Sequence, residues 1–291
     1  KATANGGAIA AYSGSQIDEI NGDFIGNYVS AVLDEKVESR EYADTGKMVS
    51  AGGGAIHIEG KWVDNNQASS DITKIGTING NFESNSATGD AYANGGAIYV
   101  KGGTKTPVEI GTINGGFKSN TVTALTEQAV GKASTGGAIS IKVDGDKDAT
   151  VTVNGDFETN SVTTNATDAL GGAIYNEGTL TVNGAFKGNK VVSETGAANG
   201  GALYNVGTTT LGGDTSFTMN EAGFAGAIWN EGELVFNNGT SQMTFGDNKA
   251  TGSSGGGGAI YNKGNIDEIA HTLFVKNEGY HGGAINNTSQ G

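Results

Sequence analysis

The stretch that decides the fold runs from residue 95 to residue 139 and holds two short motifs. It opens with Gly95-Gly96-Ala97-Ile98, continues to Phe117-Lys118-Ser119-Asn120, and comes back to Gly136-Gly137-Ala138-Ile139. The first motif therefore returns with one copy of the second motif in between. A return of motifs in a fixed order is typical of proteins built from stacked repeats.

Both motifs continue along the whole chain in strict alternation. The first occurs nine times, with its alanine at Ala8, Ala55, Ala97, Ala138, Ala173, Ala202, Ala227, Ala259 and Ala284. The second occurs eight times and begins at Phe24, Phe82, Phe117, Phe157, Phe186, Phe217, Phe245 and Phe274. This pattern predicts one repeat domain over residues 1–291. We expect it to be a segment of a longer protein, because the chain starts and stops within the repeat pattern.

A third apolar run lies between the two motifs and often closes on Asn-Gly, as in residues 76–80, 151–155 and 180–184. Each unit thus holds three runs of strand length, separated by Gly and Asn. No useful length of chain shows the 3.6-residue period of an amphipathic helix. The sequence predicts an all-β fold, a right-handed parallel β-helix of about eight coils with three strands each, about 38 Å long at about 4.8 Å per coil.

Alternation along a strand assigns the faces of each coil. We expect the Ile and Phe of the motifs to point inward and to stack from coil to coil. Two residues after the Ile, the later coils carry asparagines that predict a ladder of hydrogen-bonded amides, namely Asn176, Asn205, Asn230, Asn262 and Asn287. We expect the Asn of Phe-x-x-Asn to turn a corner, because Asn tolerates the left-handed backbone conformation.

Composition and charge narrow the classes of partner. The formal net charge is −14, from 17 Lys and Arg against 31 Asp and Glu. No basic cluster is visible, which argues against nucleic acid and against an anionic membrane surface. No cysteine is present, so disulfides and thiolate chemistry are excluded. No apolar run approaches the length that a membrane-spanning helix needs, and we expect no direct membrane insertion of this segment.

The alternation of Gly-Gly-Ala-Ile with Phe-x-x-Asn resembles the repeats of the chlamydial polymorphic outer-membrane proteins and related autotransporter passengers, over nearly the whole chain. The resemblance implies a right-handed β-helix passenger that a C-terminal membrane β-barrel carries outward, with adhesion as its role. It also implies an extracellular location on the bacterial surface, attached to the outer membrane through a domain outside this chain. Members from Chlamydia tend to contain cysteine, and this chain departs from them in having none.

Long insertions between the motifs are the first candidates for binding, because loops on a rigid scaffold commonly bind ligands. Residues 28–52 carry Tyr28 and Tyr42, and the insertion at residues 60–74 carries Trp62. The alternative is that these insertions are tolerated and neutral.

The residue that follows the motif Ile gives the second candidate. Alternation predicts that it points outward, so stacked coils would align Tyr175, Tyr204, Trp229 and Tyr261 in an exposed aromatic stripe. Such a stripe would stack on sugar rings or contact a partner protein. The alternative is that these side chains stabilise the sheet by packing on their neighbours.

Catalysis is the competing class, since parallel β-helices include polysaccharide lyases and hydrolases. Those sites need carboxylates that converge on one face. Asp23 and Asp156 precede the motif Phe, but the same slot holds Asn81, Gly116 and Ala185 in other coils. The three histidines, at residues 57, 271 and 281, show no metal-ligand spacing. We expect no enzyme activity, no metal and no cofactor.

We therefore expect an adhesin or passenger segment, a rigid rod that presents loops and one face to a host cell-surface protein or glycan. A carbohydrate-active β-helix enzyme and a passive stalk are the alternatives. The repeat series shows no polar cap at either end, which favours continuation of the solenoid or end-to-end self-association.

Overall fold

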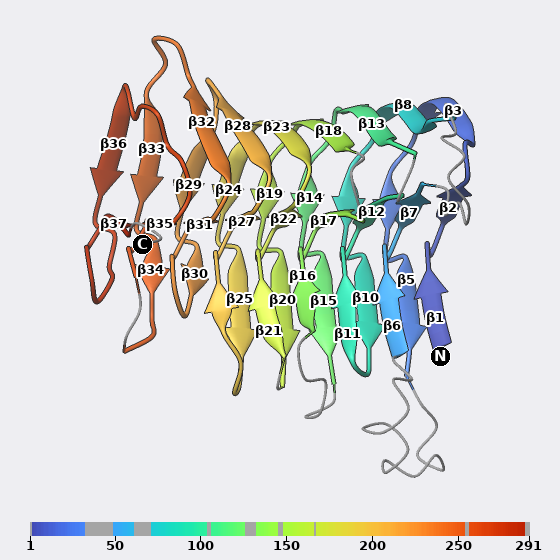
Figure 1. Ribbon diagram of the computed structural model, residues 1–291, viewed down its shortest axis with the longest axis horizontal. Coiled ribbons are helices and arrows are strands. Elements are labelled where there is room, and N and C mark those ends of the chain that lie inside the picture. Colours follow the sequence, from blue (N-terminus) through green and yellow to red (C-terminus); the bar gives the residue numbers. More distant parts are fainter. Residues whose placement is uncertain are drawn as a thin grey trace.

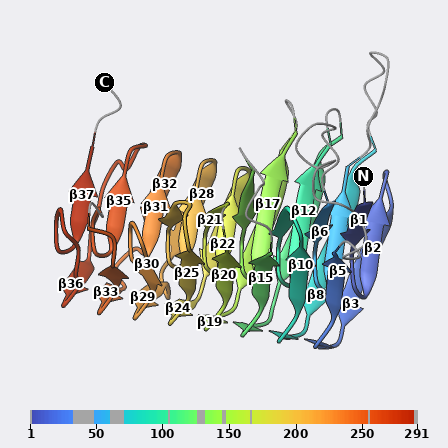
Figure 2. The same ribbon diagram turned by 90° about the horizontal axis from the view of Figure 1, so that it is seen from below.

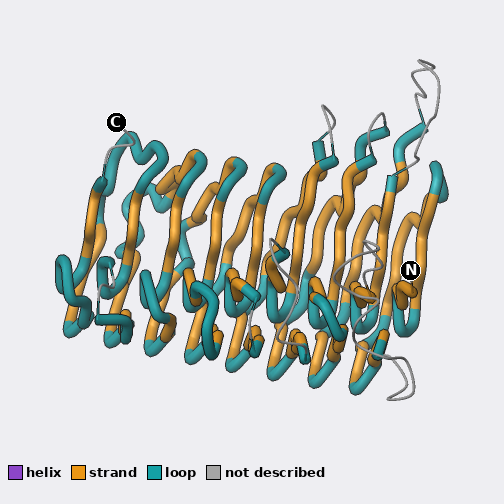
Figure 3. Tube along the Cα trace, turned by 60° about the horizontal axis from the view of Figure 1, so that its bottom comes forward, coloured by secondary structure: helices purple, strands orange, loops and turns teal. Residues whose placement is uncertain are grey.

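The computed structural model of the protein describes residues 2–32, 49–60, 71–103, 106–125, 132–144, 148–165, 167–253 and 256–288. Within these ranges all regular structure is β-strand, as the tube trace shows (Figure 3). The strands form five parallel sheets, and the chain winds through them as a right-handed β-helix whose coils stack along the long axis (Figure 1, Figure 2). The predicted fold class is confirmed.

The chain passes through five sheets, which we name A to E in chain order, and the described residues after β26 add no strand to sheet A. Sheet A contains β1 (Ala2–Asn5), β6 (Val49–Gly52), β11 (Tyr92–Asn94), β16 (Ala133–Thr135), β21 (Asp168–Leu170) and β26 (Ala198–Asn199). Sheet B contains β2 (Ile9–Tyr12), β7 (Ile56–Glu59), β12 (Ile98–Gly102), β17 (Ile139–Val143), β22 (Ile174–Asn176), β27 (Leu203–Asn205), β31 (Ile228–Asn230), β35 (Ile260–Asn262) and β37 (Ile285–Asn287).

The other three sheets complete the coil. Sheet C contains β3 (Gln16–Asn21), β8 (Thr73–Asn79), β13 (Val108–Ile113), β18 (Ala149–Asn154), β23 (Thr179–Asn183), β28 (Thr208–Gly212) and β32 (Glu233–Asn237). Sheet D contains β4 (Phe24–Ile25), β9 (Phe82–Glu83), β14 (Phe117–Lys118), β19 (Phe157–Glu158), β24 (Ala185–Lys187), β29 (Ser216–Thr218), β33 (Met243–Gly246) and β36 (Thr272–Val275). Sheet E contains β5 (Tyr28–Ala31), β10 (Ser86–Gly89), β15 (Thr121–Ala124), β20 (Ser161–Thr164), β25 (Lys190–Ser193), β30 (Glu221–Ala222) and β34 (Lys249–Ala250).

The main core lies between sheets B, C and D and is made of stacked equivalents. Each motif Ile pairs with the motif Ile or Leu of the next coil, as Ile98 does with Ile139. The motif Phe rings form one continuous stack with centroids 4.6–5.0 Å apart, which is the spacing of paired strands. Both sets belong to one buried cluster, so the predicted inward stacks are confirmed.

The number of strands per coil differs from the three expected. Sheets E and A occupy the segment between the motif Asn and the next Gly pair, where one strand runs out and the next runs back. Their inner faces share a separate small core of valine and alanine, including Ala87, Val122 and Ala169. We call this two-layered projection the arm. Its strands escape recognition in the sequence because each carries only one or two small apolar side chains among Ser, Thr and Gly.

The two glycines of the first motif have different physical roles. Gly95 has a φ of +61°, in the left-handed region that a β-carbon disfavours. Gly96 is needed for close approach instead, because a β-carbon there would overlap the carbonyl oxygen of Gly137 in the next coil. Together they let the chain turn from the arm into sheet B while the coils stay in contact.

Two buried asparagine ladders run along the rod. The predicted ladder after the motif Ile is present, with Asn176 Nδ2 donating to Asn205 Oδ1 at 3.0 Å and equivalent bonds continuing to Asn287. A second, longer ladder joins the motif asparagines, from Asn27 through to Asn277, at 2.9–3.0 Å. The sequence did not reveal this second ladder.

The corner before each motif Asn corrects a prediction. The residue that adopts the left-handed conformation is the one before the Asn, for example Ser84 (φ 56°), Thr159 (φ 54°) and Met219 (φ 55°). The Asn itself is buried, and each of its polar atoms is bound: Asn120 Nδ2 donates both to Asn160 Oδ1 and to the carbonyl of Phe82. The motif Asn therefore fixes the corner through the hydrogen bonds of its buried amide, and not by adopting the left-handed conformation itself.

Candidate binding surfaces

The turns that join sheet E to sheet A form the tip of the arm and lie in a row along one edge of the rod (Figure 1). In the coil of β10 and β11 only Asp90 and Ala91 make this connection. In the preceding coil residues 32–48 take the same place, because β5 pairs with β10 and β6 pairs with β11. The two ends of the predicted binding loop 28–52 are therefore the arm strands β5 and β6, and residues 33–48 between them lie outside the described residues.

The candidate aromatic residues of the insertions are placed only in part. Tyr28 begins β5, and its side chain is 71% exposed. Tyr42 and Trp62 lie outside the described residues. In the sequence, Trp62 falls between β7 of sheet B and β8 of sheet C. Tyr28 is thus the one of these three that the structure places on an open surface.

The expected exposed aromatic stripe is aligned as predicted but is not exposed. Tyr175, Tyr204, Trp229 and Tyr261 stack in this order, with ring centroids 5.5, 5.9 and 4.3 Å apart. Tyr175, Tyr204 and Trp229 are 6–8% exposed, and Tyr261 is half-buried. The arm causes this burial: the rings form one cluster with Leu170 of sheet A and with Ala225, which lies in the segment between β30 and β31.

Contacts around the stripe agree with a packing role. Phe224 packs edge-on against Trp229, with ring centroids 6.1 Å apart. The ammonium of Lys263 lies 4.6 Å from the Trp229 ring and closes one side of it. The geometry therefore favours the alternative interpretation of these residues, in which they hold sheet B against the arm. Alternation alone cannot predict this, because an outward side chain is exposed only if no second layer covers it.

A charged cluster lies at the end of sheet B in the N-terminal half of the rod. Glu59 binds the ring of His57 at 3.1 Å and the ammonium of Lys101 at 2.7 Å, and Lys101 also lies 3.4 Å from Asp144. Burial by itself raises the pKa of Glu59, but the hydrogen bonds and positive charges of His57 and Lys101 outweigh it and lower the pKa to about 2. The charges satisfy one another, and the cluster is a structural ion-pair network.

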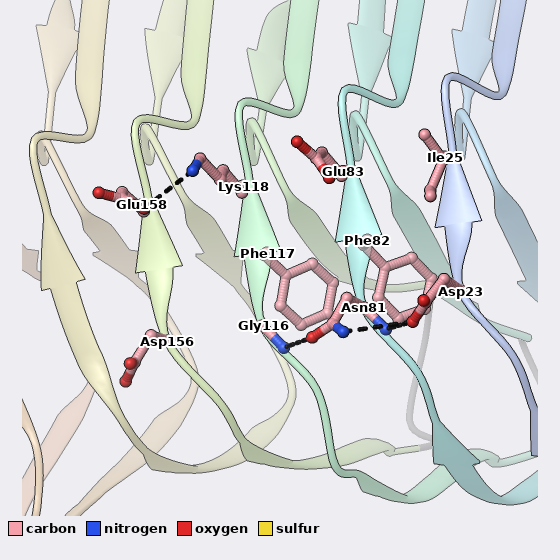
Figure 4. Close-up of a pocket in the computed structure, with 10 residues that line it drawn as sticks. All are labelled: Asp23, Ile25, Asn81, Phe82, Glu83, Gly116, Phe117, Lys118, Asp156 and Glu158. Carbon is pink, nitrogen blue, oxygen red and sulfur yellow. Dashed lines mark hydrogen bonds and ion pairs between the residues drawn. The ribbon is translucent and has the colours of Figure 1, made fainter.

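A shallow hollow of about 280 Å³ lies over sheet D, between four consecutive coils (Figure 4). Asp23 and Asp156 stand at its two ends, and Asn81 and Gly116 lie between them. Asp23 Oδ1 accepts from the backbone N–H of Asn81 at 2.7 Å, and Asn81 Oδ1 accepts from the N–H of Gly116 at 3.0 Å. The hollow exists because Gly116 interrupts this row of polar side chains.

The polar side chains of the hollow bind backbone groups next to the sheet D strands. Asp156 Oδ1 accepts from the N–H of Ala185 at 2.7 Å, so both aspartates cap backbone groups of the next coil. Lys118 and Glu158 form an exposed ion pair at 3.7 Å beside them. In the described part of the chain, no group of three or more His, Cys, Asp or Glu residues is arranged to hold a metal ion.

One set of surface residues escaped the sequence reasoning. After the motif Asn, the first and third residues of each sheet E strand point outward, and in the early coils most of them are Ser or Thr, as in Ser86-Ala87-Thr88 and Thr121-Val122-Thr123. The available signal is the repeated Asn-[Ser/Thr]-x-[Ser/Thr] pattern. The pattern has few large apolar residues and predicts a loop, whereas the segment forms strands.

Fold and surfaces together define the class of this protein: a right-handed parallel β-helix rod with a lateral arm, held by stacked rings and amide ladders. Among the described residues no helix is long and apolar enough to span a membrane. Residues 242–263 match the model of the Chlamydia polymorphic membrane protein repeat. This match includes Phe245, Asn248, Ala259 and Ile260, so it covers one copy of each motif and confirms the resemblance inferred from them. The comparison with curated proteins and the comparison with solved structures each found no match.

Proposed function

We propose that this chain is an adhesive segment of a bacterial surface protein, in which the β-helix holds the tip of the arm away from the body of the rod. The repeat match supports a place among the polymorphic membrane proteins of Chlamydia, whose name associates them with the membrane. The chain's own part would be extracellular display and binding of a host cell-surface protein or glycan.

The observation that carries this proposal is the arm. Its core is separate from the main core, so the connections at its tip vary in length without disturbing the stacked Phe and Ile. The connection is the pair Asp90–Ala91 in one coil and the whole of residues 32–48 in the coil before it, while the strands on both sides keep their register. A scaffold that tolerates such variation at one edge is suited to present binding loops there.

Attachment to host cells tests the proposal. Residues 32–48 are replaced by Asp-Ala, the connection of the next coil, which preserves β5 and β6. We expect the folded variant to lose most of its attachment to cultured epithelial cells, measured with fluorescently labelled protein. The matched control shortens residues 61–70, which connect sheets B and C, and we expect it to attach normally.

Three results would count against the proposal. Normal attachment by the arm variant would exclude the first tip loop as the adhesive element. Loss of attachment only in the 61–70 variant would place binding at the connection between sheets B and C, near Trp62. No attachment by the unaltered chain would favour a passive stalk.

A further inference from the structure

The outer face of sheet E changes character along the rod. Strand residues alternate between the arm core and solvent, so Val122 points inward while Thr121 and Thr123 point outward. Strand pairing aligns these outward positions in two columns across the first four strands. The first column is Tyr28, Ser86, Thr121 and Ser161, and the second is Ser30, Thr88, Thr123 and Thr163.

In the later coils the first column continues with charged residues that neutralise one another. Lys190 pairs with Glu221 at 2.9 Å, and Lys249 pairs with Glu278 at 2.8 Å. Lys190 follows Ser161 directly in register. The face is therefore divided into a neutral half and an internally paired charged half.

The neutral half carries unused hydrogen-bonding capacity. All eight of its side chains bear a hydroxyl group, and the hydrogen bonds among the described residues engage none of them. Each Ser or Thr hydroxyl can donate one hydrogen bond and accept two. Tyr28, at the end of the columns, adds an aromatic ring that is 71% exposed. We name these eight residues the hydroxyl face.

Charge and shape limit what this surface can bind. An anionic ligand finds no free cation in these columns, since the neighbouring Lys190 is paired. A cationic ligand finds no carboxylate in the eight positions. A neutral, hydroxyl-rich chain matches both the donor and acceptor groups and the exposed ring, because sugar rings stack on aromatic faces. Three steps of about 4.8 Å give the face a length of about 14 Å, enough for a short oligosaccharide.

We propose that the hydroxyl face binds an uncharged oligosaccharide, laid along the rod axis with a sugar ring stacked on Tyr28. This inference rests on the proposed adhesive function and names the class of ligand. The face belongs to four strands of the arm, β5, β10, β15 and β20.

Sheet C supplies a matched control surface. Its outer face also carries threonines in register, with Thr152 paired to Thr181 and Thr181 to Thr210. No exposed aromatic side chain of the described residues accompanies them on these strands, and they lie away from the arm. A general affinity of threonine-rich sheets for sugars would appear on both surfaces, whereas the proposed site would appear on sheet E alone.

The test is calorimetric titration of the full chain with cellohexaose, maltohexaose and N-acetylchitohexaose, and with a heparin hexasaccharide as the anionic probe. We expect one of the neutral probes to bind and the heparin probe not to bind. Thr123→Glu and Tyr28→Ala should each weaken the binding at least tenfold, and Thr181→Glu on sheet C should leave it unchanged. If Thr123→Glu does not fold, Thr123→Ala, which keeps the strand neutral, replaces it in the titration.

Several outcomes would overturn the inference. These are no binding of any neutral probe at millimolar concentration, binding of heparin alone, or equal loss in the Thr123 and Thr181 variants. The cell-attachment assay separates this failure from failure of the adhesive function. If the arm-loop variant loses attachment while Thr123→Glu attaches normally, the adhesive role stands and the hydroxyl face is not its ligand site.

Discussion

At the residue scale, the motif asparagines carry more of the structure than their spacing suggests. Asn160 accepts from the backbone N–H and the Nδ2 of Asn120, and it donates to Asn189 Oδ1 and to the carbonyl of Phe117. All of these hydrogen bonds meet at one fully buried side chain. Removing it leaves buried donors and acceptors without partners, which costs more than the bonds themselves contribute.

We therefore expect Asn160→Ala to lower the free energy of unfolding by about 3 kcal/mol or more, at about 1–3 kcal/mol for each orphaned group. Asn160→Asp should cost at least as much, because a buried carboxylate cannot donate to Phe117 or Asn189. Urea denaturation followed by circular dichroism measures both. Asn154→Ala is the control: Asn154 belongs to an exposed ladder with Asn114 and Asn183, and its loss should change stability by less than about 0.5 kcal/mol.

The left-handed position before each motif Asn makes a second prediction. Met219 has a φ of 55° and is 51% exposed, while Gly26 and Gly188 occupy the same slot in other coils. Replacing it relieves the backbone strain of a side chain there and loses little packing. We expect Met219→Gly to raise the free energy of unfolding by about 1 kcal/mol.

The neighbouring position provides the control for this substitution. Thr218 lies in β29 and has no positive φ, so Thr218→Gly should destabilise the protein, because glycine in a strand costs backbone entropy. Thermal and urea unfolding curves measure the change in stability of both variants. Opposite signs for the two substitutions are required; a loss of stability in both would mean that the left-handed residue carries no strain.

At the element scale, the charged cluster of β7 and β12 predicts a pH dependence. The pKa of Glu59 is lowered from 4.5 to about 2, so its ionised form is favoured in the folded state. This stabilisation is fully present above about pH 4.5 and is lost as the pH falls toward 2. We expect Glu59→Gln to lower stability by a few kcal/mol at pH 7, and the difference from the unaltered protein to disappear near pH 2.

Glu158→Gln is the control for the acid titration. Glu158 is 42% exposed and lies 3.7 Å from the ammonium of Lys118, which is also exposed, so this surface pair contributes little. Denaturation curves between pH 2 and pH 7 distinguish the two carboxylates. A constant difference for Glu59→Gln across this range would show that its role is packing rather than charge.

Sheet B and the arm form a second pair of elements whose contact can be tested. Trp229 stacks between Tyr204 and Tyr261 and is 6% exposed. We expect Trp229→Ala to reduce the free energy of unfolding by about 3–5 kcal/mol. At temperatures below the midpoint of its thermal unfolding, the variant should still attach to cells. Tyr280→Ala, which removes a 69% exposed ring, should leave stability nearly unchanged.

The arm also marks the limit of what the sequence could predict at this scale. The strands of sheets B, C and D can be predicted from alternating Ile, Val and Phe, because one face of each strand is buried and carries these side chains. Ser86–Gly89 and Tyr92–Asn94 form strands only because equivalent segments of the next coil pair with them, and a single coil does not show this. Because the arm strands are not apparent in one coil, the sequence also does not predict that the arm buries Tyr175 and Tyr204, or that its outer side carries the hydroxyl face.

At the scale of the whole molecule, each coil contacts mainly the coil before it and the coil after it. The ladders, the ring stack and the sheet pairings all connect equivalent residues one coil apart. Stability in such a solenoid is a sum over coils and over the contacts between neighbours. The rod therefore has no unique centre, and a complete coil is the smallest unit that can be removed without disturbing the register.

This periodicity makes a prediction about deletion. Removing residues 202–226, one complete period, joins Gly201 to Ala227, and Ala227 stands where Ala202 stood. Phe245 then stacks on Phe186, Asn248 follows Asn189, and Asn230 follows Asn176, so every ladder closes again. We expect a folded rod that is shorter by about 4.8 Å, with an unchanged β-type circular dichroism spectrum per residue and a maximum dimension from small-angle scattering reduced by that step.

Removing only residues 202–213 shortens the chain less but places Asp214 where Ala202 stood and puts sheet D residues against sheet B. That half-period deletion should unfold the C-terminal part of the rod, and equal damage from both deletions would contradict a structure built from interchangeable coils.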